Sequence, residues 1–152
     1  MESSWRTTAT SIGLLIARLG VGGYMLTHGW GKAQMVLDGN FDQFGDPIGL
    51  GVKASLLLAA GAEFGGAILV ILGLLTRFAA LSVAFTMGVA AFVVHGSDPW
   101  TMAEGFRLVQ EGLAQSSASK EPALLYAIPF LALVFTGAGR FSIDARFVRG
   151  RD

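Results

Sequence analysis

The chain has 152 residues, of which 53% are hydrophobic and 14% are charged, and its formal net charge is zero. Globular domains carry about 25% charged residues, so this deficit favours a membrane protein over a soluble bundle. The zero net charge gives no reason to expect nucleic acid as a partner. Cysteine is absent, which excludes disulfides, thiolate catalysis and iron–sulfur ligation within this chain.

Four apolar stretches have the length needed to cross a bilayer core, which takes about 20 mostly apolar residues per helix. They cover residues 11–32, 54–75, 78–95 and 122–136, and the last is the shortest. Its internal proline is tolerable in a membrane helix when neighbouring helices satisfy the freed carbonyl group. We therefore predict an all-α membrane protein, a single domain over residues 1–152 folded as a four-transmembrane-helix bundle.

The connections between these stretches predict how the helices are joined. The second and third stretches meet at Thr76 and Arg77, so they must form an antiparallel hairpin. The other two connections, 34–53 and 96–121, are longer and polar. Within the second of them, apolar residues recur at roughly helical spacing between Trp100 and Leu113. This pattern predicts a short helix lying at the membrane interface in the last outer loop.

Lysine and arginine residues near the ends of the stretches are divided unequally between two sides, and this bias sets topology in membrane proteins. We predict both termini in the cytoplasm and both long loops outside. The Arg-rich C-terminal tail is most simply a topology signal, and binding of anionic lipid is a weaker alternative. The predicted inner side collects Arg6, Arg77, Arg140, Arg146, Arg149 and Arg151, and the outer side collects Lys32, Lys53, Arg107 and Lys120.

Two charged residues lie at membrane depth, where a charge is costly and needs a reason. Arg18 lies ten residues before His28, about 15 Å from the outer end of its helix, and Glu63 lies nine residues after Ala54, about 13–14 Å from the same side. Because the two helices run antiparallel, we predict a direct ion pair between Arg18 and Glu63. Such a pair either locks the fold or faces a ligand cavity, and both alternatives stay open.

Small residues share the helical face of Glu63, where they either let a neighbouring helix approach or leave room for a ligand. A G-x-x-x-G motif at Gly61 and Gly65 is suited to close helix packing on another face. The small residues on the face of Glu63 are Ala59, Ala60, Gly66 and Ala67.

A polar group gathers at the predicted outer mouth of the bundle. His28 and Lys32 lie about 40° apart around the first helix, and Arg18 lies within about 80° of both. His95 ends the third stretch on the same side. These residues are candidates for ligand binding or proton handling, although a single histidine is more often a helix-end residue that meets water. We expect no haem or metal, because the chain has only two histidines.

At these residues the sequence resembles the DoxX family of small bacterial membrane proteins, over almost the whole chain. The resemblance implies a four-helix membrane bundle in the bacterial cytoplasmic (inner) membrane. It also implies that six polar residues are functionally relevant, without assigning their chemical roles: Arg18, His28, Lys32, Glu63, Arg77 and His95. The matching segments are R-L-G-V-G-G at Arg18 to Gly23, H-G-W-G-K at His28 to Lys32, E-F-G-G-A-I-L-V-I-L-G-L-L-T-R at Glu63 to Arg77, His95, E-P-A-L-L-Y at Glu121 to Tyr126 and G-A-G-R-F-S-I-D at Gly137 to Asp144.

The resemblance also implies a function, because some members of the family are membrane subunits of thiosulfate:quinone oxidoreductases and others are associated with oxidative stress or quinones. We therefore expect a membrane subunit of a quinone-linked redox system, which handles quinone or anchors an oxidoreductase partner. Lys32 and His28 would donate hydrogen bonds to a quinone carbonyl, and a histidine would relay protons. Since the chain has no obvious electron carrier, it would need a flavin, haem or dithiol partner, or a directly reducing substrate.

Two alternatives from other classes stay open. The first is a small-molecule transporter or channel that works as an oligomer, although Arg18 at matching depth would neutralise the carboxylate that such a transporter needs. The second is a non-catalytic assembly scaffold, which would tolerate glutamine at His28 or His95. In every case we expect contact with the lipid bilayer and either a protein partner or a homo-oligomer.

Overall fold

A computed structural model describes residues 2–149 and is helical, with no strand in that range. Helix α1 spans Glu2–Leu37, and α2 (Val52–Ala60), a π-helical segment η2 (Gly61–Gly65) and α3 (Gly66–Leu72) form one continuous rod. Helix α4 (Thr76–Val89) continues into a second π-helical segment, η3 (Ala90–Val94), and α6 covers Glu121–Thr136. The short elements are η1 (Phe41–Gln43), α5 (Met102–Gln110) and α7 (Ile143–Arg149).

Three of the described helices are long and apolar enough to cross a membrane: Thr7–Leu37, Val52–Leu72 and Thr76–Val94. Helix α6 is apolar but shorter, with 16 residues, and it continues through Pro129. The predicted stretches match these helices within a few residues, except that α1 begins at Glu2 rather than near residue 11 and extends to Leu37 rather than ending near residue 32. Membrane-spanning helices bring the chain into contact with the lipid bilayer.

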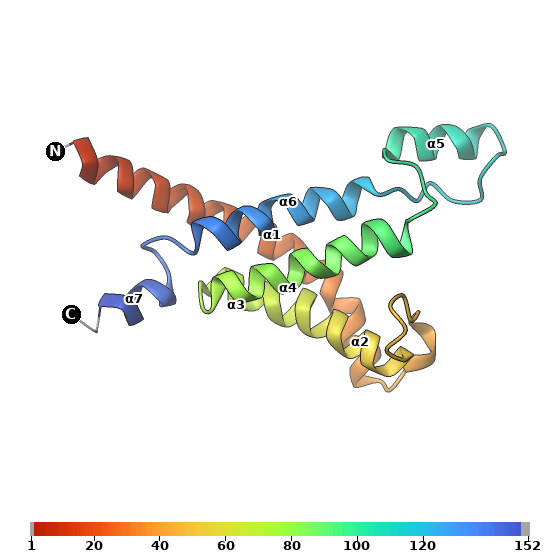
Figure 1. Cartoon of the computed structure of the whole chain (residues 1–152), viewed down its shortest axis with the longest axis horizontal. Coiled ribbons are helices and arrows are strands. Elements are labelled where there is room, and N and C mark those ends of the chain that lie inside the picture. The colour runs from red at the N-terminus through yellow and green to blue at the C-terminus, as the bar shows by residue number, and fades with distance from the viewer. Residues whose placement is uncertain (1, 150–152) are drawn as a thin grey trace.

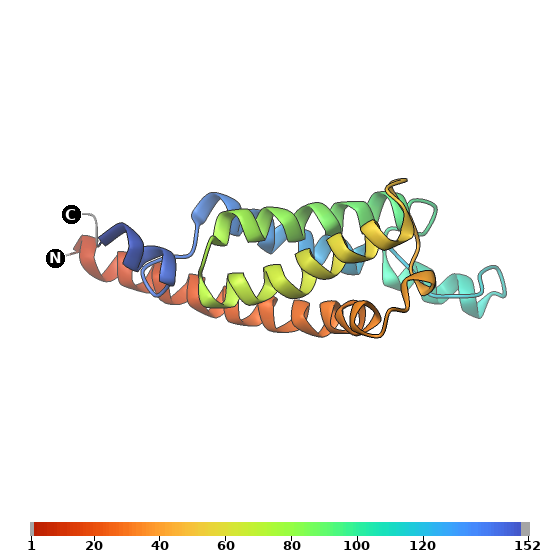
Figure 2. The ribbon, with the colours of Figure 1, turned by 90° about the horizontal axis from the view of Figure 1, so that it is seen from below.

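The long helices run side by side along the long axis of the molecule (Figures 1 and 2). Helix α6 packs most extensively against α4, and α1 packs against the rod formed by α2, η2 and α3. The core between them includes the fully buried side chains of Met25, Val70, Val83 and Phe130. The two long connections, 38–51 and 95–120, lie at one end of the bundle, which we call the loop end; α7 lies near the other, the α7 end.

Close packing against α1 depends on glycines of α1 itself, and the predicted role of Gly61 and Gly65 in packing is wrong. A Cβ atom at Gly29 would lie 2.5 Å from the backbone nitrogen of Phe64. A Cβ atom at Gly61 or Gly65 would meet nothing within 4 Å. The reason is that both glycines belong to η2, where the wider π-helical turn changes which residues face α1.

The hairpin between α3 and α4 is as tight as predicted, although the turn covers residues 73–75, just before Thr76. The carboxylate of Asp144 accepts hydrogen bonds from the backbone N–H groups of Leu75 and Thr76, at 2.8 and 3.0 Å. Gly73 has φ +68°, and a Cβ atom there would lie 1.9 Å from Nη1 of Arg18. A side chain at this position would therefore clash as well as strain the backbone.

The predicted short helix after His95 is present as α5, and Oγ1 of Thr101 caps it by accepting a hydrogen bond from the backbone N–H of Glu104 at 3.3 Å. In Figure 1 this helix projects beyond the loop end, past the ends of α4 and α6. A hydrogen bond of 2.7 Å from the backbone N–H of Met102 to the carboxylate of Glu121 ties its start to α6. Its placement at the membrane interface stays a prediction.

Candidate functional site

A cavity of about 900 Å³ opens between the rod of α2, η2 and α3 on one side and α4, η3 and α6 on the other. We call it the loop-end cavity, because the connection 38–51 contributes side chains to its rim. Most of its lining is aliphatic or aromatic. Its polar lining includes four of the residues proposed from sequence, His28, Lys32, Glu63 and His95, together with Ser55, Ser82, Thr86 and Tyr126.

An ion pair between Lys32 and Glu63 is the central polar feature of the cavity. The Nζ atom of Lys32 donates a hydrogen bond to Oε2 of Glu63 at 2.6 Å. The side chain of Glu63 is only 3% exposed, whereas that of Lys32 is 25% exposed. Gly29, one turn before Lys32, allows η2 to approach α1 closely enough for this contact. Glu63 is thus held in place by a cation that also lines the cavity.

The predicted ion pair between Arg18 and Glu63 is wrong, because the two residues lie at different levels of the bundle. Arg18 is fully buried and donates through Nη2 to the backbone carbonyl of Phe141, beside Gly73 at the α7 end. The depth estimate placed the outer end of the first helix near His28, but α1 continues to Leu37. Arg18 therefore lies about 28 Å from that end, whereas Glu63 lies about 16 Å from the start of α2.

His28 contributes an aromatic contact across the cavity wall. Its ring packs edge-on against that of Tyr126 with centroids 4.9 Å apart, and the Tyr126 hydroxyl lies 3.5 Å from Nδ1 of His28. Because Tyr126 belongs to α6, this contact joins the first and last long helices at the cavity. A hydroxyl and an imidazole in contact provide both donor and acceptor groups for a polar ligand atom.

His95 lies at the loop end, directly after η3, and Nδ1 of its ring is 2.8 Å from Oδ2 of Asp98. The two π-helical segments thus flank the site: Glu63 lies within η2, and His95 follows η3. Single π-helical turns occur often at functional sites, because the inserted residue re-aims the neighbouring side chains.

The cavity is bordered by exposed apolar side chains on the flank of the bundle. Leu57 and Leu58 of α2 and Phe78, Leu81 and Phe85 of α4 all line it, and each is between 45% and 69% exposed. Exposed apolar groups on membrane-spanning helices face lipid. The cavity therefore joins a lipid-facing flank to a buried polar group.

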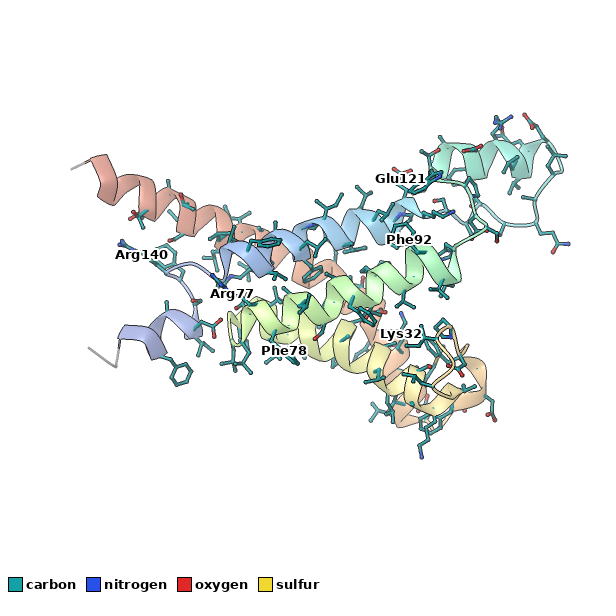
Figure 3. All side chains as sticks on the ribbon, viewed as in Figure 1. Lys32, Arg77, Phe78, Phe92, Glu121 and Arg140 are labelled. Carbon is teal, nitrogen blue, oxygen red and sulfur yellow. The ribbon has the colours of Figure 1, made fainter. Side chains whose placement is uncertain are left out.

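Two residues proposed from sequence lie outside the cavity. Arg18 is buried at the α7 end, where Nε and Nη1 have no hydrogen-bond partner among the described residues. Arg77 lies at the same end, where Nη2 donates to the carbonyl of Phe135 at 3.3 Å (Figure 3). The resemblance grouped these arginines with the histidines, but the fold separates them along the bundle.

Four polar residues line the cavity without having been predicted from the sequence: Ser55, Ser82, Thr86 and Tyr126. Tyr126 belongs to the segment from Glu121 to Tyr126, which supports the family resemblance, so this segment could have indicated it as a site residue. Thr86 and Ser55 are isolated hydroxyl residues in apolar helices, and nothing in their neighbourhood distinguishes them. Among the described residues, no group of three or more His, Cys, Asp or Glu side chains could hold a metal ion.

The fold and the site define an integral membrane protein in which membrane-spanning helices border a mainly apolar cavity that contains a few polar and charged side chains. The sequence model of the DoxX family matches residues 13–96, more than half of the chain, and this protein belongs to that family. The match runs from residue 13, within α1, through η3, and it includes His28, Lys32, Glu63 and His95.

Two relatives from Haemophilus influenzae, both described only as uncharacterized proteins, support this assignment. One is 32% identical over 139 residues, which cover 90% of this chain and 91% of the relative. The other is 31% identical over 88 residues, which cover 57% of this chain and 49% of the relative. No solved structure matches the chain.

Proposed function

We propose that this protein is a four-span subunit of the bacterial cytoplasmic membrane that binds a quinone in the loop-end cavity, as part of a quinone-linked redox system. One observation carries the proposal: His28, Lys32, Glu63 and His95 converge on one cavity that borders a lipid-facing flank. A quinone combines carbonyl acceptors on a flat ring with an apolar tail. Such a molecule needs polar donors at one end of its site and apolar walls along the rest.

The residues of the cavity fit this group. Lys32 carries an ammonium group, which has three donors, and Glu63 takes one of them, so the ammonium is held in place with others to spare. The Tyr126 hydroxyl and the imidazoles of His28 and His95 are further donors to a carbonyl oxygen. The exposed leucines and phenylalanines of α2 and α4 would accommodate the tail. Cavities that bind small molecules commonly measure about 300–1,000 Å³, which includes this one.

A bound quinone would supply the two-electron redox chemistry, and the chain would supply binding and proton handling. An imidazole ring can both donate and accept a proton, so His28 and His95 are the candidates in this cavity for exchanging protons with water. The cysteine-free chain provides no thiol carrier, so electrons would come from a partner subunit or a reducing substrate. With α6 as the fourth span, both ends of the chain lie on the cytoplasmic side.

The transporter alternative is less well supported by the contacts of Glu63. A carboxylate that exchanges protons and cations must be accessible, but Glu63 is nearly fully buried and paired with Lys32. The sequence predicted that Arg18 would neutralise this carboxylate, and in the structure Lys32 does so instead.

The test is to purify the chain in mild detergent, extract the bound lipids, and measure quinone by mass spectrometry, then to titrate decylubiquinone. We expect stoichiometric binding by the native chain and at least a tenfold loss in Lys32→Met and His28→Gln. Lys53→Met is the matched control, because Lys53 is exposed and lies outside the cavity lining.

Absence of quinone binding by the native chain would overturn the proposal. A stable protein partner without quinone would then favour the scaffold. If neither is found, flux assays with Glu63→Gln would test the transporter. Equal binding by all variants would place the quinone outside this cavity.

A further inference from the structure

A second pocket, of about 690 Å³, lies at the α7 end, far from the loop-end cavity. It is formed by the N-terminal half of α1, the end of α3 and the segment that leads into α7. We call it the Arg140–Arg146 pocket, after the two cations that line it. Its apolar wall comprises Leu15, Leu72, Phe141, Ile143 and Ala145, and its hydroxyl groups come from Thr8 and Ser142.

Both arginines of this pocket are exposed, and neither side chain forms a salt bridge with another residue that the structure describes. The carboxylate nearest in sequence, that of Asp144, is engaged elsewhere, since it accepts the backbone N–H groups of Leu75 and Thr76. The two guanidinium groups are therefore available to a ligand. Guanidinium groups match the geometry of phosphate oxygens and bind them in a bidentate manner.

The segment that carries these arginines is fixed to the bundle. The backbone N–H of Arg140 donates to Oγ of Ser11 at 3.3 Å, the Phe141 carbonyl accepts from Arg18, and the backbone N–H of Asp144 donates to the Gly73 carbonyl at 2.8 Å. Arg140 thus lies close to the point where α6 ends (Figure 3). The segment that carries the cations is therefore bonded to the end of the bundle.

We propose that the Arg140–Arg146 pocket binds the phosphate group of an anionic phospholipid, with an acyl chain against Leu15 and Leu72. The apolar wall favours a lipid over free phosphate, because an inorganic ion would leave that wall uncovered. Basic pockets between membrane helices on the cytoplasmic side are suited to anionic headgroups. This inference does not depend on quinone binding at the other end of the bundle.

The experiment is native mass spectrometry of the full chain in detergent, titrated with palmitoyl-oleoyl-phosphatidylglycerol or, separately, with the phosphatidylcholine of the same acyl chains. We expect the native chain to retain phosphatidylglycerol preferentially. The double variant Arg140→Gln/Arg146→Gln should retain it about ten- to thirty-fold less. The double variant Arg140→Lys/Arg146→Lys, which keeps both charges, should keep the preference in part.

The matched control is Lys53→Gln/Arg107→Gln, which removes the same charge from the loop end and should bind like the native chain. Circular dichroism checks that all variants are folded. The proposal is overturned if the native chain does not distinguish the two lipids, or if the control loses as much binding. It is also overturned if 10 mM inorganic phosphate (roughly a cellular concentration) displaces phosphatidylglycerol fully, since the site would then be one for free phosphate.

Discussion

At the scale of single residues, the pair of Lys32 and Glu63 decides the character of the loop-end cavity. Glu63 is buried and Lys32 is its only salt-bridge partner among the described residues. A buried pair adds little net stability, but removing one partner leaves an uncompensated charge. The pair therefore holds the ammonium group of Lys32 at the cavity wall, and removing either partner should lower the stability of the fold strongly.

We predict that Lys32→Met lowers the free energy of unfolding by about 3 kcal/mol, because Glu63 is left buried without its cation. Adding Glu63→Gln should recover part of that loss. Unfolding in sodium dodecyl sulfate, followed by circular dichroism, measures both changes. The control is Lys53→Met, which removes an exposed ammonium 5.2 Å from the Phe41 ring and should cost about 1 kcal/mol or less. Equal losses for the two lysines would contradict the structural role of the pair.

Asp46 anchors the loop 38–51 at the rim of the cavity. Its carboxylate accepts hydrogen bonds from the Ser55 hydroxyl at 2.7 Å and from the backbone N–H groups of Gly51 and Leu50 at 2.8 and 3.0 Å. The Ser55 hydroxyl first, and then these N–H groups, hold the pKa of Asp46 below its ordinary value. Because Ser55 also lines the cavity, Asp46 connects the loop to the site.

This shift predicts a pH dependence. When the pKa of a carboxyl group is lower in the folded chain than in the unfolded chain, its ionised form stabilises the fold. This stabilisation is complete at a pH above the pKa of the unfolded chain, and it is lost as the pH falls through the pKa of the folded chain. We expect Asp46→Asn to be less stable than the native chain at pH 7, with a difference that shrinks below about pH 4. Unfolding of both proteins between pH 7 and pH 3 measures it. A difference that stays constant over this range would contradict the assignment.

At the scale of elements, the approach of α1 to η2 places the polar groups of the cavity. Gly29 lies against the backbone of Glu63 and Phe64, while Gly31 in the same helix has nothing within 4 Å of its ideal Cβ position. Alanine raises the helix propensity at both positions but meets close neighbours only at Gly29. Comparing the two alanine variants therefore separates the effect of helix propensity from the effect of packing.

We predict that Gly29→Ala costs about 1–3 kcal/mol, because the added methyl group pushes α1 away from η2. Gly31→Ala should be neutral or stabilising by up to about 1 kcal/mol, since alanine favours a helix. Unfolding in detergent compares the two. If the proposed function is correct, decylubiquinone binding should weaken only in Gly29→Ala. Equal stability of the two variants would mean that α1 and η2 do not approach closely.

At the scale of the whole molecule, the arrangement of the ends predicts the topology. The connections 38–51 and 95–120 lie at one end of the bundle, and α7 lies near the other (Figure 1). Two spans, the rod of α2, η2 and α3 and then α4 with η3, lie between the two long connections, so these connections share one side of the membrane. With α6 as a fourth span, α7 lies on the opposite side. The distribution of lysine and arginine predicts that this side lies outside the cell.

Because the chain has no cysteine, single introduced cysteines report this topology directly. We predict that Asn40→Cys and Ser116→Cys react with a membrane-impermeant maleimide in intact spheroplasts. Phe147→Cys on α7 should react only after lysis. Labelling of positions 40 and 116 from opposite sides would mean that either the rod of α2, η2 and α3 or the helix formed by α4 and η3 does not cross the membrane. Labelling of position 147 from the same side as position 116 would mean that α6 does not cross. Labelling of position 147 alone in intact spheroplasts would mean that the orientation is the reverse of the predicted one.

The sequence alone predicted the helical class, the positions of the apolar helices and a polar group of His28, Lys32 and His95 at one end of the bundle. Hydropathy and the order of motifs carry this information, because a helix that crosses lipid must satisfy its backbone internally and expose apolar side chains. These signals are local and do not depend on how the helices pack.

Only the tertiary structure decided which charges meet. The partner of Glu63 is Lys32 rather than Arg18, because the register between α1 and the rod depends on where α1 ends and on the close contact at Gly29. The wider turns of the π-helical segments η2 and η3 also change which of their side chains face the neighbouring helices. If two membrane helices are shifted by a few turns relative to one another, their hydrophobic patterns still match almost equally well. Hydropathy therefore could not reveal the correct register. The close contact of Gly29 with the backbone of η2 fixes it in the structure.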